Sequence, residues 1–274
     1  MSERADLMEM GEAMLAENSF RGTILEIRNI RKRFGAVQAL DGVSFHVSAG
    51  EVIALVGDNG AGKSTTIKMI AGVEQPDDGE ILFENQSVRL SSPVAAEKLG
   101  IQTVYQDLAL CDNLDIVANL FLGREIARSI VPGVLKRIDK HEMERRAVPV
   151  LRDLGISLPP LSTQVARLSG GQRQAVAVAR AVLWGSKLVM FDEPTAALGV
   201  AQQKVVLDLI AKLSQSGKAV LIISHNLSDV FKVADRIVVL RLGRTTAAFA
   251  GNEVRPEQVI ACITGAAEEA LTRR

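Results

Sequence analysis

The sequence has few cysteines and no net charge, and each of these shortages excludes a class of protein. There are 2 Cys among 274 residues, and Cys111 and Cys262 lack the close spacing of metal-binding or disulfide-rich proteins. We therefore expect free thiols in a reducing compartment. Lys plus Arg equals Asp plus Glu at 32 each, whereas nucleic-acid binders usually carry a basic excess. Nucleic acid is not an expected partner.

Long apolar runs are also missing. No stretch approaches the roughly 18–20 apolar residues that a transmembrane helix needs, although 47% of the residues are apolar. The segment 1–23 has scattered acidic residues and lacks the apolar centre of a secretory signal, so we expect a loose tail or a short amphipathic helix. A second tail is expected at 266–274. The residues between the tails, 24–265, are enough for a substantial core.

Short β-rich runs alternate with helical ones, which predicts an α/β fold. Strands are expected at 24–30, 43–47, 51–57, 79–86, 101–106, 187–194, 218–225 and 235–244. The last three are apolar enough for a sheet that is covered on both faces. Between 106 and 185 the strand-like runs disappear, and segments 114–125, 139–155 and 169–183 look helical. We predict a mixed β core at 24–105 and 186–265, with a helical subdomain inserted at 106–185.

The stretch GDNGAGKS matches the phosphate-binding pattern G-x-x-x-x-G-K-[ST]. It follows a predicted strand and opens a predicted helix, which is the context that the pattern requires. Glycines let backbone N–H groups face phosphate oxygens, and the helix start adds partial positive charge. Lys63 adds a full charge and Ser64 a hydroxyl for Mg²⁺. The expected nucleotide-binding residues are Gly57, Asp58, Asn59, Gly60, Ala61, Gly62, Lys63, Ser64 and Thr65.

Such a loop also occurs in kinases, GTPases and motors. A second motif helps to distinguish among these classes of nucleotide-binding protein. The buried strand LVMF ends at Asp192 and Glu193. Asp192 is expected to hold the water shell of Mg²⁺, and Glu193 to orient and deprotonate the attacking water. Two carboxylates after a strand are usually an ordinary strand end. Together with a phosphate loop, they predict nucleotide hydrolysis.

A second glycine motif, LSGGQ at 168–172, also opens a predicted helix. Ser169 and the backbone N–H groups of Gly170 and Gly171 therefore suit an anion. One chain thus has two places for a phosphate group. LSGGQ resembles the signature motif of ATP-binding cassette (ABC) ATPases, and the resemblance extends over residues 24–265.

Other motifs follow in the order that this family shows. Gln106, after a strand, resembles the Q-loop glutamine; His225 resembles the switch histidine; and Phe34 stands where the family has an aromatic that stacks on adenine. Each residue alone would be uninformative, and their joint order carries the resemblance. The segment 194–200 stands at the D-loop, where Gly199 replaces the usual aspartate and lacks its side-chain contact across the dimer. Hydrolysis is still expected because the other motifs are intact.

The resemblance implies an ATPase that uses ATP and Mg²⁺. In this family two cassettes pack head to tail, and the signature loop of one covers the ATP held by the other, which explains the two loops. One cassette per chain then makes a homodimer the simplest expectation. The implied catalytic residues are Glu193, His225 and Gln106. The implied Mg²⁺ ligands are Ser64, Gln106 and Asp192, and the implied contacts to the partner's nucleotide are Ser169, Gly170, Gly171 and Gln172.

Segments 104–125, 194–200 and 263–266 resemble the ATPase subunits of bacterial monosaccharide importers, of which the fructose-type ones are single cassettes of this size. The resemblance implies a peripheral subunit on the cytoplasmic face of the inner membrane. Its partners would be two integral membrane permease subunits and, indirectly, a periplasmic sugar-binding protein.

The segment 106–124 is expected to receive the permeases' coupling helices. Its apolar residues suit either a docking surface or the core of the insert. Two other functions stay open: a non-transport ABC ATPase, such as one used in cluster assembly, and an importer of another solute.

Overall fold

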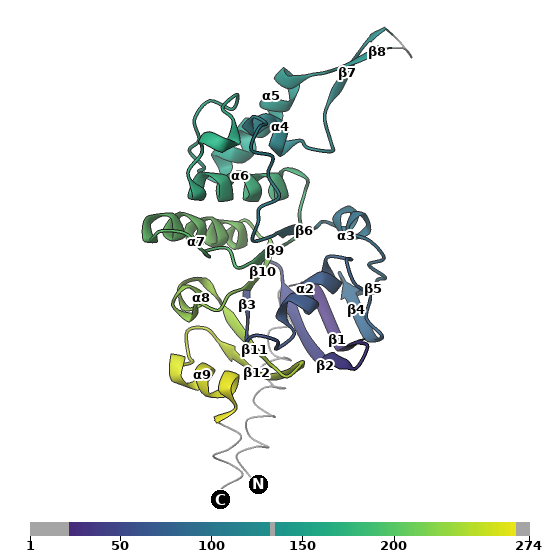
Figure 1. The fold of residues 1–274 in the computed structure, drawn as a ribbon, viewed down its shortest axis with the longest axis vertical. Helices are drawn as coiled ribbons and strands as arrows, with labels where there is room; N and C mark the ends of the chain where they lie inside the picture. The colour runs from purple at the N-terminus through teal and green to yellow at the C-terminus, as the bar shows by residue number, and fades with distance from the viewer. Residues whose placement is uncertain (1–21, 132–134, 267–274) are drawn as a thin grey trace, which may run out of the picture.

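The computed structural model describes residues 22–131 and 135–266, and the strands in these ranges form two larger sheets and a hairpin (Figure 1). The first sheet is antiparallel, with the order β2-β1-β4-β5. Its strands are β1 (Thr23–Phe34), β2 (Val37–Ser48), β4 (Asp78–Phe83) and β5 (Gln86–Ser87).

The second sheet has the order β12-β11-β3-β10-β9-β6, and all its pairings are parallel except that of the edge strand β12. Its strands are β3 (Val52–Val56), β6 (Ile101–Val104), β9 (Leu188–Asp192), β10 (Ala219–Ile223), β11 (Arg236–Arg241) and β12 (Arg244–Ala250). Every residue of β3 and β10 is buried. Such continuous apolar strands are expected where a parallel sheet is covered on both faces, and the predicted α/β class is confirmed.

The helices divide between the sheets and an upper, mainly helical part of the molecule (Figure 1). Near the sheets lie α2 (Lys63–Ile70), α3 (Pro93–Leu99), α7 (Val200–Gln215), α8 (Leu227–Val233) and α9 (Pro256–Thr264). The upper part contains α4 (Ile116–Leu120), α5 (Lys140–Asp153) and α6 (Gly170–Leu183). Among the described residues, none of the helices is both long and apolar enough to span a membrane.

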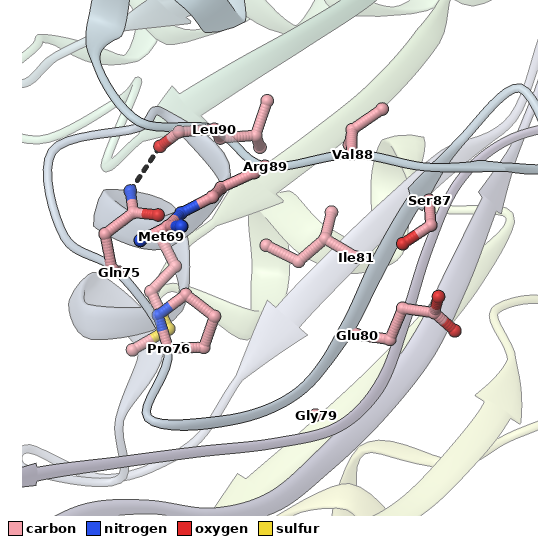
Figure 2. A pocket seen from close by; sticks show the side chains of 10 residues that line it. All are labelled: Met69, Gln75, Pro76, Gly79, Glu80, Ile81, Ser87, Val88, Arg89 and Leu90. Carbon is pink, nitrogen blue, oxygen red and sulfur yellow. Dashed lines mark hydrogen bonds between the residues drawn. The ribbon is translucent and has the colours of Figure 1, made fainter.

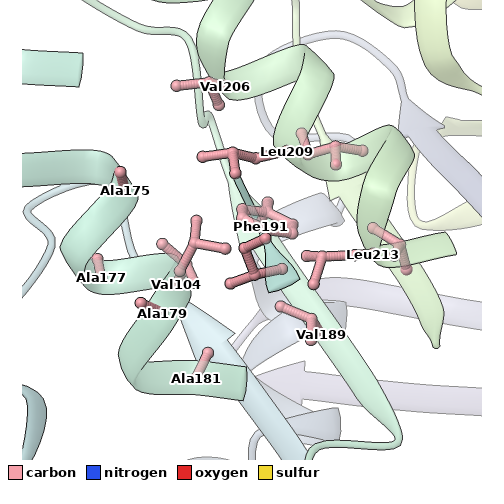
Figure 3. Close-up of a cluster of buried hydrophobic side chains, with 14 of the residues drawn as sticks. Val104, Ala175, Ala177, Ala179, Ala181, Val189, Phe191, Val206, Leu209 and Leu213 are labelled. Atoms are coloured by element: carbon pink, nitrogen blue, oxygen red, sulfur yellow. The ribbon is translucent and has the colours of Figure 1, made fainter. Parts of the chain in front are cut away.

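The core joins the two parts through α6. Phe191 of β9 lies between the helix α6, with its buried alanines, and the apolar side chains of α7 (Figure 3). Phe191 is completely buried. Because alanine is small, α6 approaches its neighbours closely, and interiors of this density tolerate little change in volume.

Three details of the fold differ from the sequence predictions. The insert 106–185 is not only helical, because β7 (Ala127–Val131) and β8 (Leu135–Ile138) pair as an antiparallel hairpin. The sequence of these two strands lacks the alternating apolar pattern that predicts strands. The strand expected at 235–244 corresponds to β11, whereas the strand that follows it, β12, was not predicted.

The third difference concerns the helix expected at 114–125. In the structure only the short helix α4, Ile116–Leu120, forms in this segment. Asp115 begins it, because its Oδ1 accepts a hydrogen bond from Ala118 N at 2.7 Å. The helix ends where Phe121 leaves the helical conformation, with φ −110°. The two tails expected from the sequence lie mostly outside the described residues.

The apolar segment after Gln106 is mostly core rather than an open docking surface. Ile116, Val117, Leu120 and Phe121 are at most 1% exposed, and Phe121 meets Trp184 edge to face, with ring centroids 5.4 Å apart. Leu108 and Leu110 are partly buried against the same core. Leu122, at 42% exposure, is the large apolar side chain of this stretch that faces outward.

Phe121→Ala should therefore destabilise the protein by about 3–5 kcal/mol, the cost of a cavity left by a buried aromatic residue. The measurement is the free energy of unfolding from urea denaturation. Leu122→Ala is the matched control and should change it by less than about 0.5 kcal/mol, as exposed positions usually do. Equal effects of the two substitutions would contradict the assignment of this segment to the core.

Candidate functional site

Four predicted motifs lie at one edge of the parallel sheet because four neighbouring strands end there. In the register, Ile223 of β10 faces Leu55 of β3 on one side and Asp192 of β9 on the other. Val104 of β6 faces Phe191. Gly57, Glu193, His225 and Gln106 each follow within two residues of these positions. Crevices at the carboxyl ends of parallel strands are the usual ligand sites of open α/β sheets.

The phosphate loop runs from the end of β3 into α2, in a shape that needs glycine. A Cβ atom on Gly57 would lie 2.2 Å from the carbonyl oxygen of Leu240, and one on Gly62 would lie 2.4 Å from Leu40 Cδ2. Gly62 also has φ 103°, which only glycine adopts at low cost. The loop is therefore pressed against β2 and β11, while Asp58, Asn59, Gly60 and Ser64 are exposed.

The start of α2 is prepared for an anion. The first N–H groups of any helix have no acceptor within it, and no described residue accepts from the backbone N–H of Lys63, Ser64 or Thr65. Lys63 Nζ donates to the carbonyl oxygens of Gly57 at 2.7 Å and Asp58 at 2.9 Å, which holds the ammonium group inside the loop. Ala61 is buried beneath it.

Burial and opposite charge act against each other at Lys63. Burial lowers the pKa of its ammonium group, whereas Glu193, Asp58 and Asp192 raise it. For Asp192, burial and then the nearby charge of Glu193 raise the pKa of the carboxyl group, while Lys63 lowers it. A cation beside Asp192 would relieve the cost of its negative charge.

Glu193 and His225 contact each other directly. His225 Nδ1 lies 2.8 Å from Glu193 Oε2, and the side chains are 72% and 17% exposed, respectively. Glu193 adopts a left-handed conformation with φ 51°, which is uncommon for a non-glycine residue and often marks functional sites. Its N–H donates to Ile223 O at 2.9 Å, so backbone and side chain are both held to the end of β10.

Two further predicted residues lie around this edge. Gln106 is exposed, just past β6. Phe34 ends β1, is 43% exposed, and has Lys32 Nζ 5.4 Å from its ring centroid. The next strand, β2, contacts the phosphate loop through Leu40. Phe34 therefore belongs to the sheet that borders the loop.

The signature residues are not brought to this edge. They lie at the start of α6, in the part of the molecule above α2 (Figure 1). Ser169 Oγ accepts from Gln172 N at 3.3 Å, and Gln172 Oε1 accepts from Ser169 N at 3.0 Å, so the two residues cap their own helix. Gly170 is partly exposed, and Gly171 is buried.

The start of α6 packs against the start of α7 within the same chain. A Cβ atom on Gly170 would lie 3.0 Å from Leu198 Cδ2, and one on Gly171 would lie 3.3 Å from Gln202 Cβ. Gln202 Oε1 in turn accepts from Gly199 N at 3.3 Å. Gln202 therefore contacts both the signature loop and the D-loop, a role that the sequence did not suggest.

Arg173 and Arg180 on α6 were also missed. Arg180 donates to the carbonyl oxygens of Ala109 and Leu108 at 2.8 and 2.9 Å, and Arg173 Nη1 lies 2.9 Å from Asp112 Oδ1. Burial lowers the pKa of Arg180. The two arginines thus connect the signature helix to the segment after Gln106. A cation inside the apolar run AVAVARAVL was the signal that could have revealed Arg180.

A cavity of about 230 Å³ lies elsewhere, between the end of α2 and strands β4 and β5 (Figure 2). Its lining includes Gln75, which donates to the carbonyl oxygen of Leu90, and the side chains of Met69 and Ile81. It contains none of the predicted site residues. The candidate site is therefore the strand-end edge and not this cavity.

A parallel sheet with a phosphate loop after β3, and with two carboxylates at the end of β9, is the arrangement of a P-loop nucleoside triphosphatase. Residues 40–196 match the family model described as ABC transporter. The chain therefore belongs to the ABC transporter family, and it is an ATP-binding, ATP-hydrolysing domain.

Curated relatives cover most of the chain. It is 50% identical over 221 residues to the xylose/arabinose import ATP-binding protein XylG of Sulfolobus acidocaldarius, covering 81% of this chain and 86% of that protein. It is 46% identical over 250 residues to the fructose import ATP-binding protein FrcA of Rhizobium meliloti, covering 89% and 95%. Against the ribose import ATP-binding protein RbsA 1 of Rubrobacter xylanophilus it is 39% identical over 251 residues, covering 92% of this chain and 49% of that protein.

Solved structures agree with the fold. The crystal structure of a nucleotide-free ATP-binding cassette from an ABC transporter aligns with a TM-score of 0.74 and 29% identity, covering 87% of this chain and 95% of that one. A cassette in its ADP conformation aligns with a TM-score of 0.73 and 29% identity, covering 88% and 95%.

Gly199 makes a prediction possible. It is the N-cap of α7, has no side chain to cap the helix, and adopts an extended conformation that any residue accepts, with free space around a Cβ atom. Gly199→Asp should therefore be more stable than Gly199→Ala by about 1 kcal/mol, because aspartate accepts from the first N–H groups of the helix and alanine does not. Both substitutions reduce the conformational entropy of the unfolded chain to a similar extent. The difference between the stabilities of the two variants therefore measures the effect of the N-cap side chain. Thermal unfolding of the two variants measures it, and equal stabilities would show that α7 does not begin at this residue.

Proposed function

We propose that this chain hydrolyses ATP to drive the import of a monosaccharide through membrane permease subunits. One observation carries the proposal: the strand ends bring Lys63, Asp192 and Glu193 to a single edge. Relatives that match the chain over most of their length are named sugar import ATP-binding proteins. These relatives name different sugars, so the proposal is limited to monosaccharides as a class.

Each residue of the edge has a proposed task. Lys63 and the free N–H groups at the start of α2 bind the phosphates of ATP, and Phe34 stacks on the adenine. Glu193 takes a proton from the attacking water, and the contact with His225 holds its carboxylate in place. The bond to the γ-phosphorus forms on the side of that water, and the bond to the leaving ADP oxygen breaks.

The donors around the loop fit Mg²⁺, which prefers oxygen ligands. We propose that the hydroxyl of Ser64, the carboxylate of Asp192 and the side-chain oxygen of Gln106 hold it. Bound Mg²⁺ would neutralise phosphate charge. The burial that raises the pKa of Asp192 supports this assignment, since a nearby cation favours its charged form.

The second phosphate-binding motif supports a homodimer. Ser169 and Gly170 begin α6, where Gly170 lies against Leu198 and Gln202 at the start of α7, and we propose that they contact the nucleotide of a second copy. Two integral membrane permease subunits and a periplasmic sugar-binding protein would complete the importer, which places this subunit at the cytoplasmic face of the membrane. A non-transport ABC ATPase would have the same edge but no effect on uptake.

Glu193→Gln should keep ATP binding and lower turnover by about 10²–10⁴, because the amide keeps the shape of the side chain and loses its basicity. In cells that lack the wild-type protein, the variant should fail to restore uptake of labelled monosaccharides. Phosphate release and uptake are the two measurements.

Asp208 on α7 is not part of the edge, and Asp208→Asn is the control that should leave both measurements unchanged. Wild-type turnover in Glu193→Gln would contradict its role as the base. Lost turnover with normal uptake of every sugar tested would contradict the transport proposal alone.

The proposed dimer predicts that two inactive variants rescue each other. Lys63→Ala should lose phosphate binding, and Ser169→Arg should block the signature loop. In a mixed dimer, one site combines both defects and the other has an intact Lys63 and an intact Ser169. Random exchange forms about half of the dimers as mixed, so activity should recover to at most about a quarter of wild type.

ATPase activity and ATP binding of the mixture, compared with each variant alone, are the measurements. A signature loop that acted within its own chain would give no recovery at any mixing ratio. Ser169→Arg keeps its own phosphate loop and should still bind ATP, so ATP-dependent dimer formation in the mixture without turnover would show that the partner contact exists and that hydrolysis needs two working sites.

A further inference from the structure

The β7–β8 hairpin extends beyond the helices at the upper end of the molecule (Figure 1). Its strands pair with each other from Ala127↔Ile138 onward, and a hydrogen bond of 2.7 Å from Asp139 N to Ile126 O holds its base. A two-stranded hairpin alone is marginally stable in water. An external contact would therefore affect this element strongly.

The hairpin carries cations that have no partner. Arg128 lies directly opposite Arg137 in the register, and Lys136 lies opposite Ser129. All three basic side chains are exposed, and none forms an ion pair or hydrogen bond with a described residue. Like charges in opposed positions destabilise a strand pair. The sequence from 126 to 138 contains no Asp or Glu that could offset them.

Neighbouring cations of the same part of the molecule are paired. Lys140 Nζ lies 2.9 Å from Asp115 Oδ2, and Arg124 bonds to Glu97. Arg145 and Arg146 lie 2.7 and 2.8 Å from the carboxylate oxygens of Glu142. Hydrogen bonds from the two arginines lower the pKa of Glu142 to about 2. Arg152 and Arg167 are also exposed and form no ion pair with a described residue, but the hairpin places two such cations, Arg128 and Arg137, directly opposite each other.

We propose that Arg128, Lys136 and Arg137 bind anionic lipid headgroups of the membrane at which this subunit works. The location at a membrane rests on the proposed function; the charge arrangement does not. Opposed residues share one face of a strand pair and adjacent residues alternate, so the arginines lie on one face and Lys136 on the other. Cations on both faces of the hairpin can each contact lipid headgroups when the hairpin lies in the headgroup layer. An acidic site on a protein partner would contact only one of the two faces.

Each basic residue near an anionic membrane increases partitioning about fivefold, so three should contribute on the order of a hundredfold. The attraction should weaken as salt rises, because exposed charges are screened.

The test is sedimentation of the full chain with lipid vesicles. The wild-type protein should bind vesicles of equal parts phosphatidylcholine and phosphatidylglycerol and not vesicles of phosphatidylcholine alone. The triple variant R128Q/K136Q/R137Q should lose on the order of a hundredfold in binding. The control R145Q/R146Q/R152Q removes the same charge from α5 and should bind like wild type. ATPase activity should be unchanged in both variants.

Three results would overturn the proposal. Failure of the wild-type protein to bind anionic vesicles would show that it has no lipid site. Equal losses of vesicle binding in both triple variants would show an effect of net charge alone. Unchanged lipid binding with reduced sugar uptake in the hairpin variant would assign the hairpin to a protein partner. Vesicle binding needs neither hydrolysis nor permeases, so its result stands even where Glu193→Gln disproves the transport function.

Discussion

The parallel pairing of β3, β10, β9 and β6 is the constraint on which the candidate site depends. Hydrogen bonds between these strands fix their register, so that the carboxyl ends of all four strands lie at the same edge of the sheet. Lys63, Glu193, His225 and Gln106 come from four distant parts of the chain. A slip of one residue in any strand would reverse which face each of its side chains occupies. The fully buried strands β3 and β10 resist such a slip, so core packing also positions the chemistry.

Helix α6 connects this edge to the rest of the molecule. Its small apolar residues pack on α7 and β9 (Figure 3), while Arg173 and Arg180 hold the segment that follows Gln106. Its first turn touches Leu198 and Gln202 of the D-loop region. The signature motif, the Q-loop segment and the D-loop therefore share one rigid support. A displacement of α6 would move all three together, because dense interiors transmit motion rather than absorb it.

The sequence predicted those parts of the fold that local patterns determine. The phosphate loop, the Asp192–Glu193 pair and the buried strands have short signatures, because strand, glycine turn and helix start are encoded by neighbouring residues. The β7–β8 hairpin was not predicted because its sequence shows no alternation of apolar and polar residues. The extent of the 114–125 helix was overestimated because its apolar residues fit a helix as well as a buried turn. Gln202 and Arg180 act through contacts far along the chain, which no local pattern records.

The starts of α2 and α6, which we propose bind phosphate, differ in their free hydrogen-bond donors. This difference bears on whether ATP binds before or after the dimer closes. At α2, no described residue accepts from the N–H groups of Lys63 and Ser64, and the ammonium of Lys63 lies inside the loop. At α6, Ser169 and Gln172 already cap the helix, and Arg173 is paired with Asp112. The first start can bind a free anion, whereas the second has only the N–H groups of Gly170 and Gly171 unused, and Arg173 in its first turn is already paired. In the proposed dimer, the phosphate loop therefore binds ATP first. The signature loop then contacts a phosphate that is already held, which makes closure depend on bound nucleotide rather than precede it.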